Sequence, residues 1–474
     1  MFNHKDDCES NLRVLFFIMK KEFKFQSKSY AHLDKHKKSE QLDNLITNPD
    51  WVASHGFLPL IHVLMRVKRR TGCHKRFTFK ERHIFYSSHT DSYIYQWYAQ
   101  QLSQKYESYL LTNGFSQIPT AYRSLNGKCN IDFAKEAFSF LKKQDDAFVF
   151  VTDFHSFFDT LNHSLLKSNL KKVLNTPDGL EPDWYAVYKS LIKATYFDLD
   201  ELAEYKKVTK NEFRNEKTRP KILLTHSEMK QLKSTKLHKY SEIIETDDKN
   251  IDKSKIGIPQ GTSISAVFAN VYMIDFDKRM SDYVNCVNGF YRRYSDDIII
   301  VVPITEKENL CSLFETERSK VQISVSPKKT RRFHICNGKI QEVYLTKGES
   351  EDTRKIIEYL GFSYNGNKIL IKDASLNKFY RKLDNRLYLL RDIKKDKGRL
   401  LGLKRFYRSY SHLGESARIR FNKNHKLKSQ DFQHCNFITY VNKAARIMDN
   451  PGIKHQLRKH WSHITKFLHK AQYY

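Results

Sequence analysis

The sequence predicts an α+β fold in which an antiparallel sheet is followed by an all-helical C-terminal region. Two short runs, residues 147–152 and 298–302, are apolar and rich in β-branched or aromatic residues, as in strands that are buried on both faces. Residues 290–294 form an aromatic and basic strand just before the second run. After residue 372 the apolar residues recur at three- and four-residue intervals, which indicates helices that bury one face.

Acidic residues stand at the ends of these strands. The two later strands leave only Ser295, Asp296 and Asp297 for the turn between them, and Asp and Ser are good turn formers, so an ordinary hairpin is one interpretation. A further acidic residue, Asp153, directly follows the strand at 147–152. If the strands pair in one sheet, Asp153 lies beside Asp296 and Asp297.

Three carboxylates held that close repel one another, and their pKa values rise unless divalent cations neutralise them. Oxygen ligands alone indicate Mg²⁺, which keeps part of its water and takes further ligands from substrate phosphates. Two such ions a few ångströms apart form the clamp that is used for in-line phosphoryl displacement. Asp153, Asp296 and Asp297 are therefore candidate ligands of two magnesium ions.

Five motifs between residues 75 and 362 follow the order that is found in one enzyme family. On these motifs the chain resembles a reverse transcriptase of the bacterial kind: DFHSFFD from Asp153, GIPQGTS from Gly257, YSDD from Tyr294, SVSPKKT from Ser324 and EYLGF from Glu358. Each string alone also fits an ordinary turn, helix cap or strand. The resemblance implies a right-hand polymerase, with fingers, a palm that holds the antiparallel sheet, and an all-helical thumb.

The resemblance also implies roles for the residues of the acidic site. Asp153, Asp296 and Asp297 match the catalytic carboxylates that hold two Mg²⁺ ions. Lys329 matches the lysine that protonates the leaving pyrophosphate, and it matches this position better than Lys328. The ordinary interpretation of a lysine there is a solvated charge.

Substrate-binding residues are implied in several further segments. The string KRFTFKERHIFYSSHTDSYIYQWYA, from Lys75, resembles the fingers, where a basic residue on a hairpin binds the triphosphate. An aromatic residue after the first aspartate matches the gate whose ring collides with a ribose 2′-hydroxyl, so that DNA precursors are preferred. The glycines of GIPQGTS allow close backbone approach, and its glutamine can hydrogen-bond the nucleotide. The implied residues are Arg82, Lys80, Arg123, Phe158, Gln260 and Gly261.

The expected domains are an N-terminal extension over residues 1–70, fingers and palm over 71–372, and a helical thumb over 373–474. The run HGFLPLIHVLM, from His55, is expected to be a buried helix or strand. Residues 201–255 are lysine-rich and low in large apolar residues. We expect a flexible surface insertion there, with an extra nucleic-acid contact as the alternative.

Three helices are expected in the thumb. The first is indicated by apolar residues at helical spacing: Leu376, Phe379, Leu383, Leu387 and Leu390. A second helix is expected at 437–448 and ends before the string NPG, which begins at Asn450. A third helix is expected from Ile453 to Leu468.

Length and charge agree with a large polyanionic partner. The 474 residues carry a formal net charge of +30, with a pI near 9.6 and 13% aromatic residues. Neutralisation of phosphates makes such binding salt-dependent, and aromatic faces among basic residues allow bases to stack. With 40% apolar residues the chain can bury a substantial core, so its charge does not indicate disorder.

Cysteine usage and hydropathy indicate a cytoplasmic protein without a membrane partner. The seven cysteines are scattered, without CxxC or a Cys/His spacing of zinc type, and are expected to be reduced thiols. The early apolar run at residues 14–19 is too short to span a bilayer.

The resemblance implies an RNA-directed DNA polymerase that uses dNTPs, Mg²⁺ and an RNA template to make a DNA product. Retron and group II intron enzymes are related. The strings ISAVFANVYMIDFD, SYAHLDKHKKS and PDWVASHGFLPLI are most similar to the defence-associated lineage of unknown-group and abortive-infection enzymes, with type 2 ahead of type 3. That lineage acts against bacteriophage and commonly copies a structured non-coding RNA.

Three alternatives to templated copying in defence stay open from the sequence. The first is template-independent, protein-primed DNA synthesis by an abortive-infection-type enzyme. The second is a non-catalytic RNA-binding scaffold that keeps the fold. The third is a splicing maturase. Nothing in the sequence indicates the oligomeric state.

Overall fold

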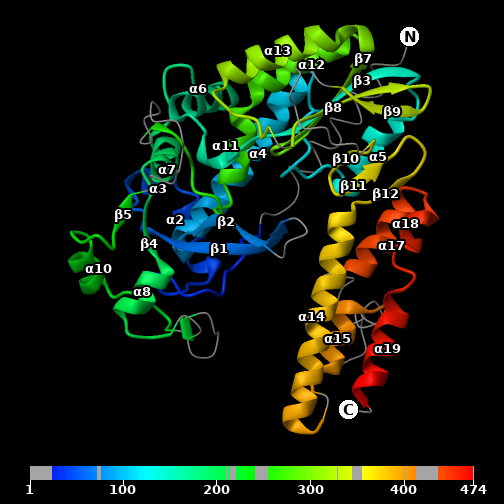
Figure 1. Ribbon diagram of the computed structural model, residues 1–474. Helices are drawn as coiled ribbons and strands as arrows, with labels where there is room; N and C mark the ends of the chain where they lie inside the picture. Colours follow the sequence, from blue (N-terminus) through cyan, green and yellow to red (C-terminus); the bar gives the residue numbers. More distant parts are fainter. Residues whose placement is uncertain are drawn as a thin grey trace, which may run out of the picture. The chain divides into compact units, whose positions relative to one another are not determined.

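The computed structural model (Figure 1) describes residues 24–71, 76–209, 212–213, 220–240, 255–327, 329–343, 355–399, 401–412 and 436–472. The chain forms two compact units, each built from separate stretches of sequence. The first unit comprises Met1–Arg123, Phe154–Asp282 and Ser312–Val325, and the second comprises Ser124–Asp153, Tyr283–Cys311 and Ser326–Tyr474. These units are divided at other residues than the expected domains, whose boundaries at residues 70 and 372 stay a prediction.

The first unit contains a four-stranded sheet in the order β2-β1-β4-β5. β1 (Leu60–Thr71) and β2 (Arg76–Tyr86) form a long antiparallel hairpin. β4 (Thr195–Asp198) pairs with β1 in parallel and with β5 (Lys239–Tyr240) antiparallel. The apolar run from His55 is thus a strand from Leu60 onward, and the expected boundary at residue 70 falls inside this hairpin.

The described part of the first unit also contains helices. They are α2 (Asp43–Ile46), α3 (Pro49–Ser54), α4 (His89–Thr112), α6 (His163–Leu174), α7 (Pro182–Ile192), α8 (Leu199–Tyr205), α10 (His226–Leu232) and α11 (Ser265–Tyr272), with short 3-10 turns at η1 (Ser39–Gln41) and η2 (Phe157–Asp159). Of these helices, α8 contacts β1 and β4. Two further helices, α12 (Ile274–Cys286) and α13 (Lys307–Lys320), continue from one unit into the other.

The structure corrects the expectation of a flexible insertion at residues 201–255 where it describes this segment. Apolar residues of α8, α10 and the chain between them are buried in a core that also contains Ile61 and Phe197: Leu202, Phe213, Leu223, Leu224, Met229 and Leu232. These residues are spread thinly among lysines, so their local density is low, but tertiary contacts gather them. Residues 210–211, 214–219 and 241–254 lie outside the described part of the chain.

The second unit is built on a five-stranded antiparallel sheet in the order β6-β7-β3-β8-β9. β3 and β7 are buried along most of their length, which accounts for their apolar runs. The bounds are β3 (Asp146–Asp153), β6 (Phe290–Tyr294), β7 (Asp297–Pro303), β8 (Arg331–Cys336) and β9 (Lys339–Glu342). The predicted antiparallel sheet is therefore confirmed.

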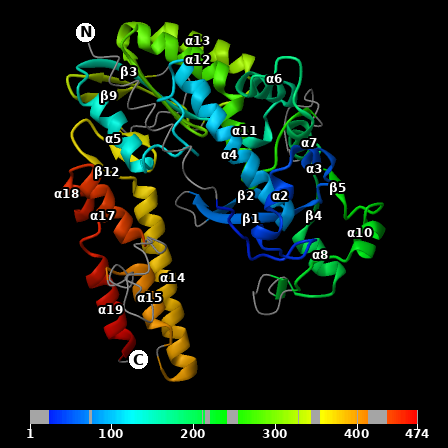
Figure 2. The ribbon, with the colours of Figure 1, turned by 180° about the vertical axis from the view of Figure 1, so that it is seen from behind.

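A three-stranded sheet and several helices complete the second unit. The strands are β10 (Ile357–Tyr359), β11 (Phe362–Tyr364) and β12 (Ile369–Ile371). The helices are α5 (Asn130–Leu141), α14 (Asp373–Lys397), α15 (Leu403–Tyr410), α17 (Phe437–Ile447), α18 (Pro451–His455) and α19 (His460–Gln472), with a 3-10 turn at η4 (Ile304–Glu306). α14 packs against α15 and α19, and the three lie side by side from the front (Figure 1) and from behind (Figure 2).

The helical predictions for this region hold except at one place. α14 buries Phe379, Leu383, Leu387 and Leu390, as the spacing predicts. The third expected helix, however, is divided into α18 and α19. Between them the amides of Leu457 and His460 donate to carbonyls only three residues earlier, as in a tight turn. No helix in the described part of the chain is long and apolar enough to cross a membrane.

Candidate active site

Two of the predicted carboxylate residues face each other at one end of the five-stranded sheet. In the pairing of β3 with β7, Asp153 lies directly opposite Asp297. Residues in such positions have Cβ atoms about 4.5–5.5 Å apart. Asp297 also pairs with Tyr294 of β6, and Asp296 lies in the turn between them. The structure thus brings the three residues together, while their metal-binding role stays a prediction.

A buried arginine supports the acidic turn, and no motif in the sequence pointed to it. Ser295 has a φ of +59°, a left-handed conformation that is uncommon outside glycine. Arg293 is 0% exposed, and its Nη1 donates to the Ser295 carbonyl oxygen over 3.0 Å. A buried guanidinium needs acceptors and negative charge around it, so it favours this turn and the carboxylates beside it. The feature of the sequence that could have indicated Arg293 is a basic residue within a strand that is largely buried.

Lys329 reaches the first aspartate from the loop that precedes β8. Its Nζ forms an ion pair with Asp153 Oδ2. The loop is fixed to the end of β3 because the Ser326 amide donates to the Asp153 carbonyl oxygen over 3.0 Å. The hydroxyl groups of Thr152 and Thr330 are also hydrogen-bonded, at 2.8 Å. Lys329 therefore lies at the carboxylates, and its role as a proton donor stays a prediction.

The donors at this site fit a divalent cation. Asp153 is 5% exposed, and its Oδ1 has no hydrogen-bond partner among the described residues. A buried carboxylate oxygen without a donor is costly unless a cation reaches it. Asp297, on the opposite strand, is exposed, so an ion held between the two remains open to water and substrate. Oxygen donors of this kind are the ligands that Mg²⁺ prefers.

The β10–β11 hairpin, which carries the EYLGF motif, contributes a buried phenol near the acidic turn. Tyr359 is 3% exposed, and its hydroxyl has no hydrogen-bond partner in the described residues. Burial, and next the charge of Asp297, raises the pKa of Tyr359, so the phenol stays protonated. Glu358, beside it, pairs with Lys372 at 2.5 Å. The motif therefore places a potential hydrogen-bond donor beside the carboxylates.

In the first unit, the GIPQGTS loop is anchored to two neighbouring segments. The Phe85 amide donates to the Gln260 carbonyl oxygen over 2.8 Å, and the Ile258 amide donates to the Phe158 carbonyl oxygen over 2.9 Å. Gly261 has a φ of +131°, and a Cβ at this position would collide with the Phe85 carbonyl oxygen. The absence of a side chain at Gly261 thus lets the backbone of this loop lie close to the backbone of β2.

The two phenylalanines after the first aspartate have different environments. Phe157 is 5% exposed and packs on Phe154, with ring centroids 5.5 Å apart. Phe158 is only partly buried. Phe157 therefore fills the core, while Phe158 is accessible enough to contact a substrate, and its role as a gate stays a prediction.

The β1–β2 hairpin presents on one face the two basic residues that are predicted to bind the triphosphate. Arg82 is directly opposite Met65, and Lys80 is directly opposite Val67. Since Arg82 and Lys80 are two residues apart on β2, their side chains and those of their partners point to the same side. Met65 is 50% exposed and Val67 38%. This basic and apolar face suits contact with phosphate and base, although contact with a triphosphate stays a prediction.

Arg123, which was expected to assist at the triphosphate, is engaged within the first unit. Its side chain is 3% exposed, and its Nε and Nη2 donate to the Glu107 carboxylate over 2.6 and 2.5 Å. Its Nη1 donates to the carbonyl oxygens of Ser116 and Pro119. These bonds hold the Arg123 loop against α4 and use the donors that a triphosphate would need.

The five motifs from Asp153 to Phe362 lie within a stretch that matches a known family, whereas Lys80 and Arg82 lie before it. The sequence model of the family described as reverse transcriptase (RNA-dependent DNA polymerase) matches residues 101–364, more than half of the chain. The chain belongs to the reverse transcriptase family. The match includes Asp153, Asp296, Asp297 and Lys329. A comparison with curated protein sequences gave no match.

Among solved structures, this reverse transcriptase is similar to yeast telomerases. The apo telomerase of Candida tropicalis, truncated from its C-terminal domain, has 12% identity and a TM-score of 0.39, over 71% of this chain and 61% of that chain. The telomerase of Candida albicans, in complex with a TWJ fragment of telomeric RNA, has 12% identity and a TM-score of 0.39. This match covers 91% of this chain and 65% of that chain. The chain thus spans less than two thirds of the length of each.

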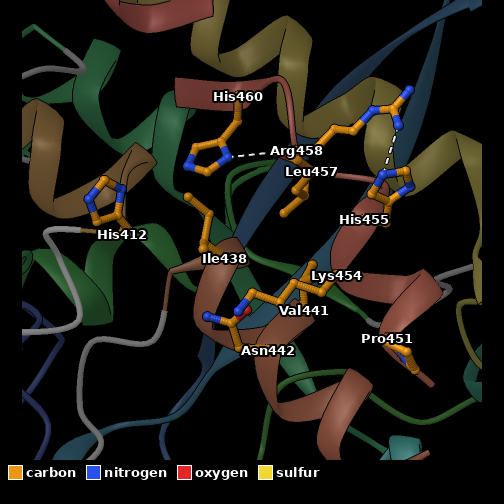
Figure 3. Close-up of a pocket in the computed structure, with 10 residues that line it drawn as sticks. All are labelled: His412, Ile438, Val441, Asn442, Pro451, Lys454, His455, Leu457, Arg458 and His460. Atoms are coloured by element: carbon orange, nitrogen blue, oxygen red, sulfur yellow. Dashed lines mark hydrogen bonds between the residues drawn. The ribbon is translucent and has the colours of Figure 1, made fainter. Parts of the chain in front are cut away.

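The reverse transcriptase also has a pocket in its helical part, drawn in Figure 3, which is not formed by the carboxylate strands. It has a volume of about 580 Å³, and α17, α18 and the turn before α19 line it. Arg458 Nη1 donates to His455 Nε2 over 2.7 Å, and His460 Nδ1 is hydrogen-bonded to the Leu457 carbonyl oxygen at 2.6 Å (Figure 3). The pocket has no part in the chemistry considered for the acidic site.

Proposed function

We propose that this reverse transcriptase is an RNA-directed DNA polymerase that transfers nucleotides from dNTPs to a primer 3′-hydroxyl with two metal ions. The observation that carries the proposal is the register of β3 with β7, which sets Asp153 opposite Asp297 with Asp296 next in the turn. Carboxylates on paired strands are held by the sheet itself, so their spacing does not depend on a loop.

Asp153, Asp296 and Asp297 would hold two Mg²⁺ ions. When bound, such ions make the primer hydroxyl more acidic and neutralise charge on the triphosphate. Lys329 carries an ammonium proton at the edge of the site and would donate it to the leaving pyrophosphate. Its ion pair with Asp153 lowers the repulsion among the carboxylates until substrate arrives.

The remaining substrate contacts are proposed for the first unit. Arg82 and Lys80 would bind the triphosphate oxygens, since a guanidinium fork matches phosphate geometry. Gln260 would hydrogen-bond the incoming nucleotide, and the anchored Gly261 would keep that loop in place. Phe158 would reject ribonucleotides by collision with the 2′-hydroxyl.

For the template we propose a structured non-coding RNA that is copied in bacterial antiphage defence. The net charge of +30 supports a polyanionic partner. Three strings, at residues 29–39, 49–61 and 264–277, support the defence-associated lineage through their resemblance to it. Sequencing of the RNA and DNA that co-purify with the protein tests this part: structured RNA with complementary DNA is expected.

Primer extension on an RNA template, with labelled primer, dNTPs and Mg²⁺, tests the activity. We expect wild type to make complementary DNA, Asp297→Asn to lose at least about a hundredfold in rate, and Asp178→Asn, at an exposed loop position, to match wild type. Random or homopolymeric DNA attached to the protein would indicate protein-primed synthesis instead. Equal inactivity of wild type and Asp297→Asn, with RNA binding retained, would indicate a scaffold.

A further inference from the structure

The end of the five-stranded sheet away from the acidic turn carries three side chains of different metal-binding chemistry. Asp146 begins β3, and His334 and Cys336 lie two residues apart on β8. Asp146 is directly opposite Cys336, so the three side chains share one face of the sheet. One carboxylate oxygen, one imidazole nitrogen and the thiol sulfur all lie within 4.8 Å of one another.

Backbone features hold this cluster in place. Asn337 and Gly338 have φ values of +48° and +73°, as in a type I′ turn, and they end β8 at Cys336. The Asn337 amide donates to the Asp145 carbonyl oxygen over 2.8 Å, which ties this turn to the start of β3. The three candidate ligands therefore stand on paired strands whose relative position is fixed by the ladder.

We propose that Asp146, His334 and Cys336 bind a zinc ion, with water as the fourth ligand. Zinc–ligand bonds of about 2.0–2.3 Å place tetrahedral ligands roughly 3.5 Å apart, so small side-chain rotations close the observed cluster. Thiolate and imidazole ligands favour zinc over Mg²⁺, which prefers oxygen. The site is thus chemically distinct from the carboxylate site at the other end of β3.

Binding requires two proton changes in the cluster. His334 Nε2 and Asp146 Oδ1 are hydrogen-bonded at 2.5 Å. The zinc ion takes the place of the proton between them, which passes to solvent, and the bound imidazole is neutral with its proton on Nδ1. The Cys336 thiol releases its proton to solvent as the Zn–S bond forms. The ion then joins the start of β3 to the end of β8, so it stabilises the folded sheet and does not take part in the proposed polymerase chemistry.

Cobalt substitution tests the proposal without any activity measurement. With the full chain kept reduced by a phosphine, we expect Co²⁺ to give a near-ultraviolet thiolate-to-cobalt charge-transfer band and tetrahedral visible bands, both removed by Zn²⁺. Oxygen ligands cannot produce the charge-transfer band, so cobalt at the acidic site does not mimic the result. Absence of the band from wild type overturns the proposal.

Variants assign the band to the cluster. Cys336→Ser should lose it, whereas Cys286→Ser, at an exposed cysteine of α12, should keep it. Asp146→Asn should weaken zinc binding at least about tenfold, measured by competition with a chromophoric chelator, while Asp145→Asn should match wild type. Circular dichroism shows which variants are folded. If Cys336→Ser does not fold, the zinc affinity of Asp146→Asn tests the site instead. Retention of the band in folded Cys336→Ser, or unchanged zinc affinity in Asp146→Asn, contradicts the proposed site.

Discussion

Asp153 and Asp297 stand directly opposite each other on two antiparallel strands, and Lys329 forms an ion pair with the first of them. This relationship joins residues 144 positions apart through the ladder between β3 and β7. A catalytic role for Asp297 therefore depends on strand register, because a slip by one residue would turn one carboxylate to the other face of the sheet.

Two replacements of Lys329 distinguish the contribution of its positive charge from that of its transferable proton. Lys329→Ala should lower the primer-extension rate constant by roughly 10–100-fold, with little effect on affinity for RNA, because both the proton donor and the partner of Asp153 are lost. Lys329→Arg restores the positive charge but not an easily donated proton. Single-turnover kinetics across a pH series measure the effect. An unchanged rate for Lys329→Ala would remove this residue from the mechanism.

Arg293 should matter for both stability and activity. Arg293→Met deletes the bond to the Ser295 carbonyl oxygen and a buried positive charge, so the free energy of unfolding should fall by about 3 kcal/mol. Urea unfolding measures this change. The control is Arg391→Met on α14. The Arg391 side chain is 42% exposed, so its replacement should change stability little. Equal stability of both variants would show that Arg293 does not support the acidic turn.

Phe157 and Phe158 provide a matched pair. Phe157→Ala should destabilise the protein by about 3–5 kcal/mol, because it leaves a cavity beside Phe154. Phe158→Ala should destabilise less and should reduce the preference for dNTPs over ribonucleotides by roughly 10–100-fold in kcat/KM. Competition between a dNTP and its ribonucleotide in primer extension measures the preference. If Phe158→Ala discriminates as well as wild type, the gate lies elsewhere.

Asp159 should make stability depend on pH. Burial raises the pKa of Asp159 from 3.8 to about 6 in the folded protein. The folded state thus binds this proton more tightly than the unfolded state, and the contribution of Asp159 to stability falls as pH rises from about 4 through 6. The penalty above pH 6 is roughly 2–3 kcal/mol.

Asp159→Asn removes that titration, so its stability relative to wild type should increase between pH 4.5 and 7.5. Urea unfolding in chelator at the two pH values measures the change, with Asp178→Asn as an exposed control. A stability difference between Asp159→Asn and wild type that is the same at both pH values would contradict the raised pKa.

The local features that the sequence predicts well are those that short-range patterns determine. The strand at 298–302 is a buried apolar run, and the aromatic and basic strand at 290–294 pairs with it across a turn. The pairing of the strand at 298–302 with the apolar run at 147–152 is what burial on both faces leads one to expect. The helix with Phe379 and Leu383 has one apolar stripe. In each case the local period and the tertiary environment agree.

The features that the sequence did not predict depend on long-range contacts. The apolar residues of 201–255 are too sparse to indicate a core until Ile61 and Phe197 are known to lie against them. By sequence Arg123 resembles a phosphate ligand, but in the structure its guanidinium pairs with Glu107, 16 residues earlier on α4. His334 and Cys336 show no zinc spacing because the third donor, Asp146, comes from another strand.

Anomalous diffraction from crystals grown with Mn²⁺, primer, RNA template and a non-hydrolysable dNTP tests the central claim most directly. We predict a manganese ion that is coordinated, at about 2.1–2.2 Å, by a carboxylate oxygen of Asp153 and by one of Asp297. Manganese peaks that touch neither residue, or a separation of the two carboxylates of more than about 10 Å, beyond what shared ions can bridge, would contradict it.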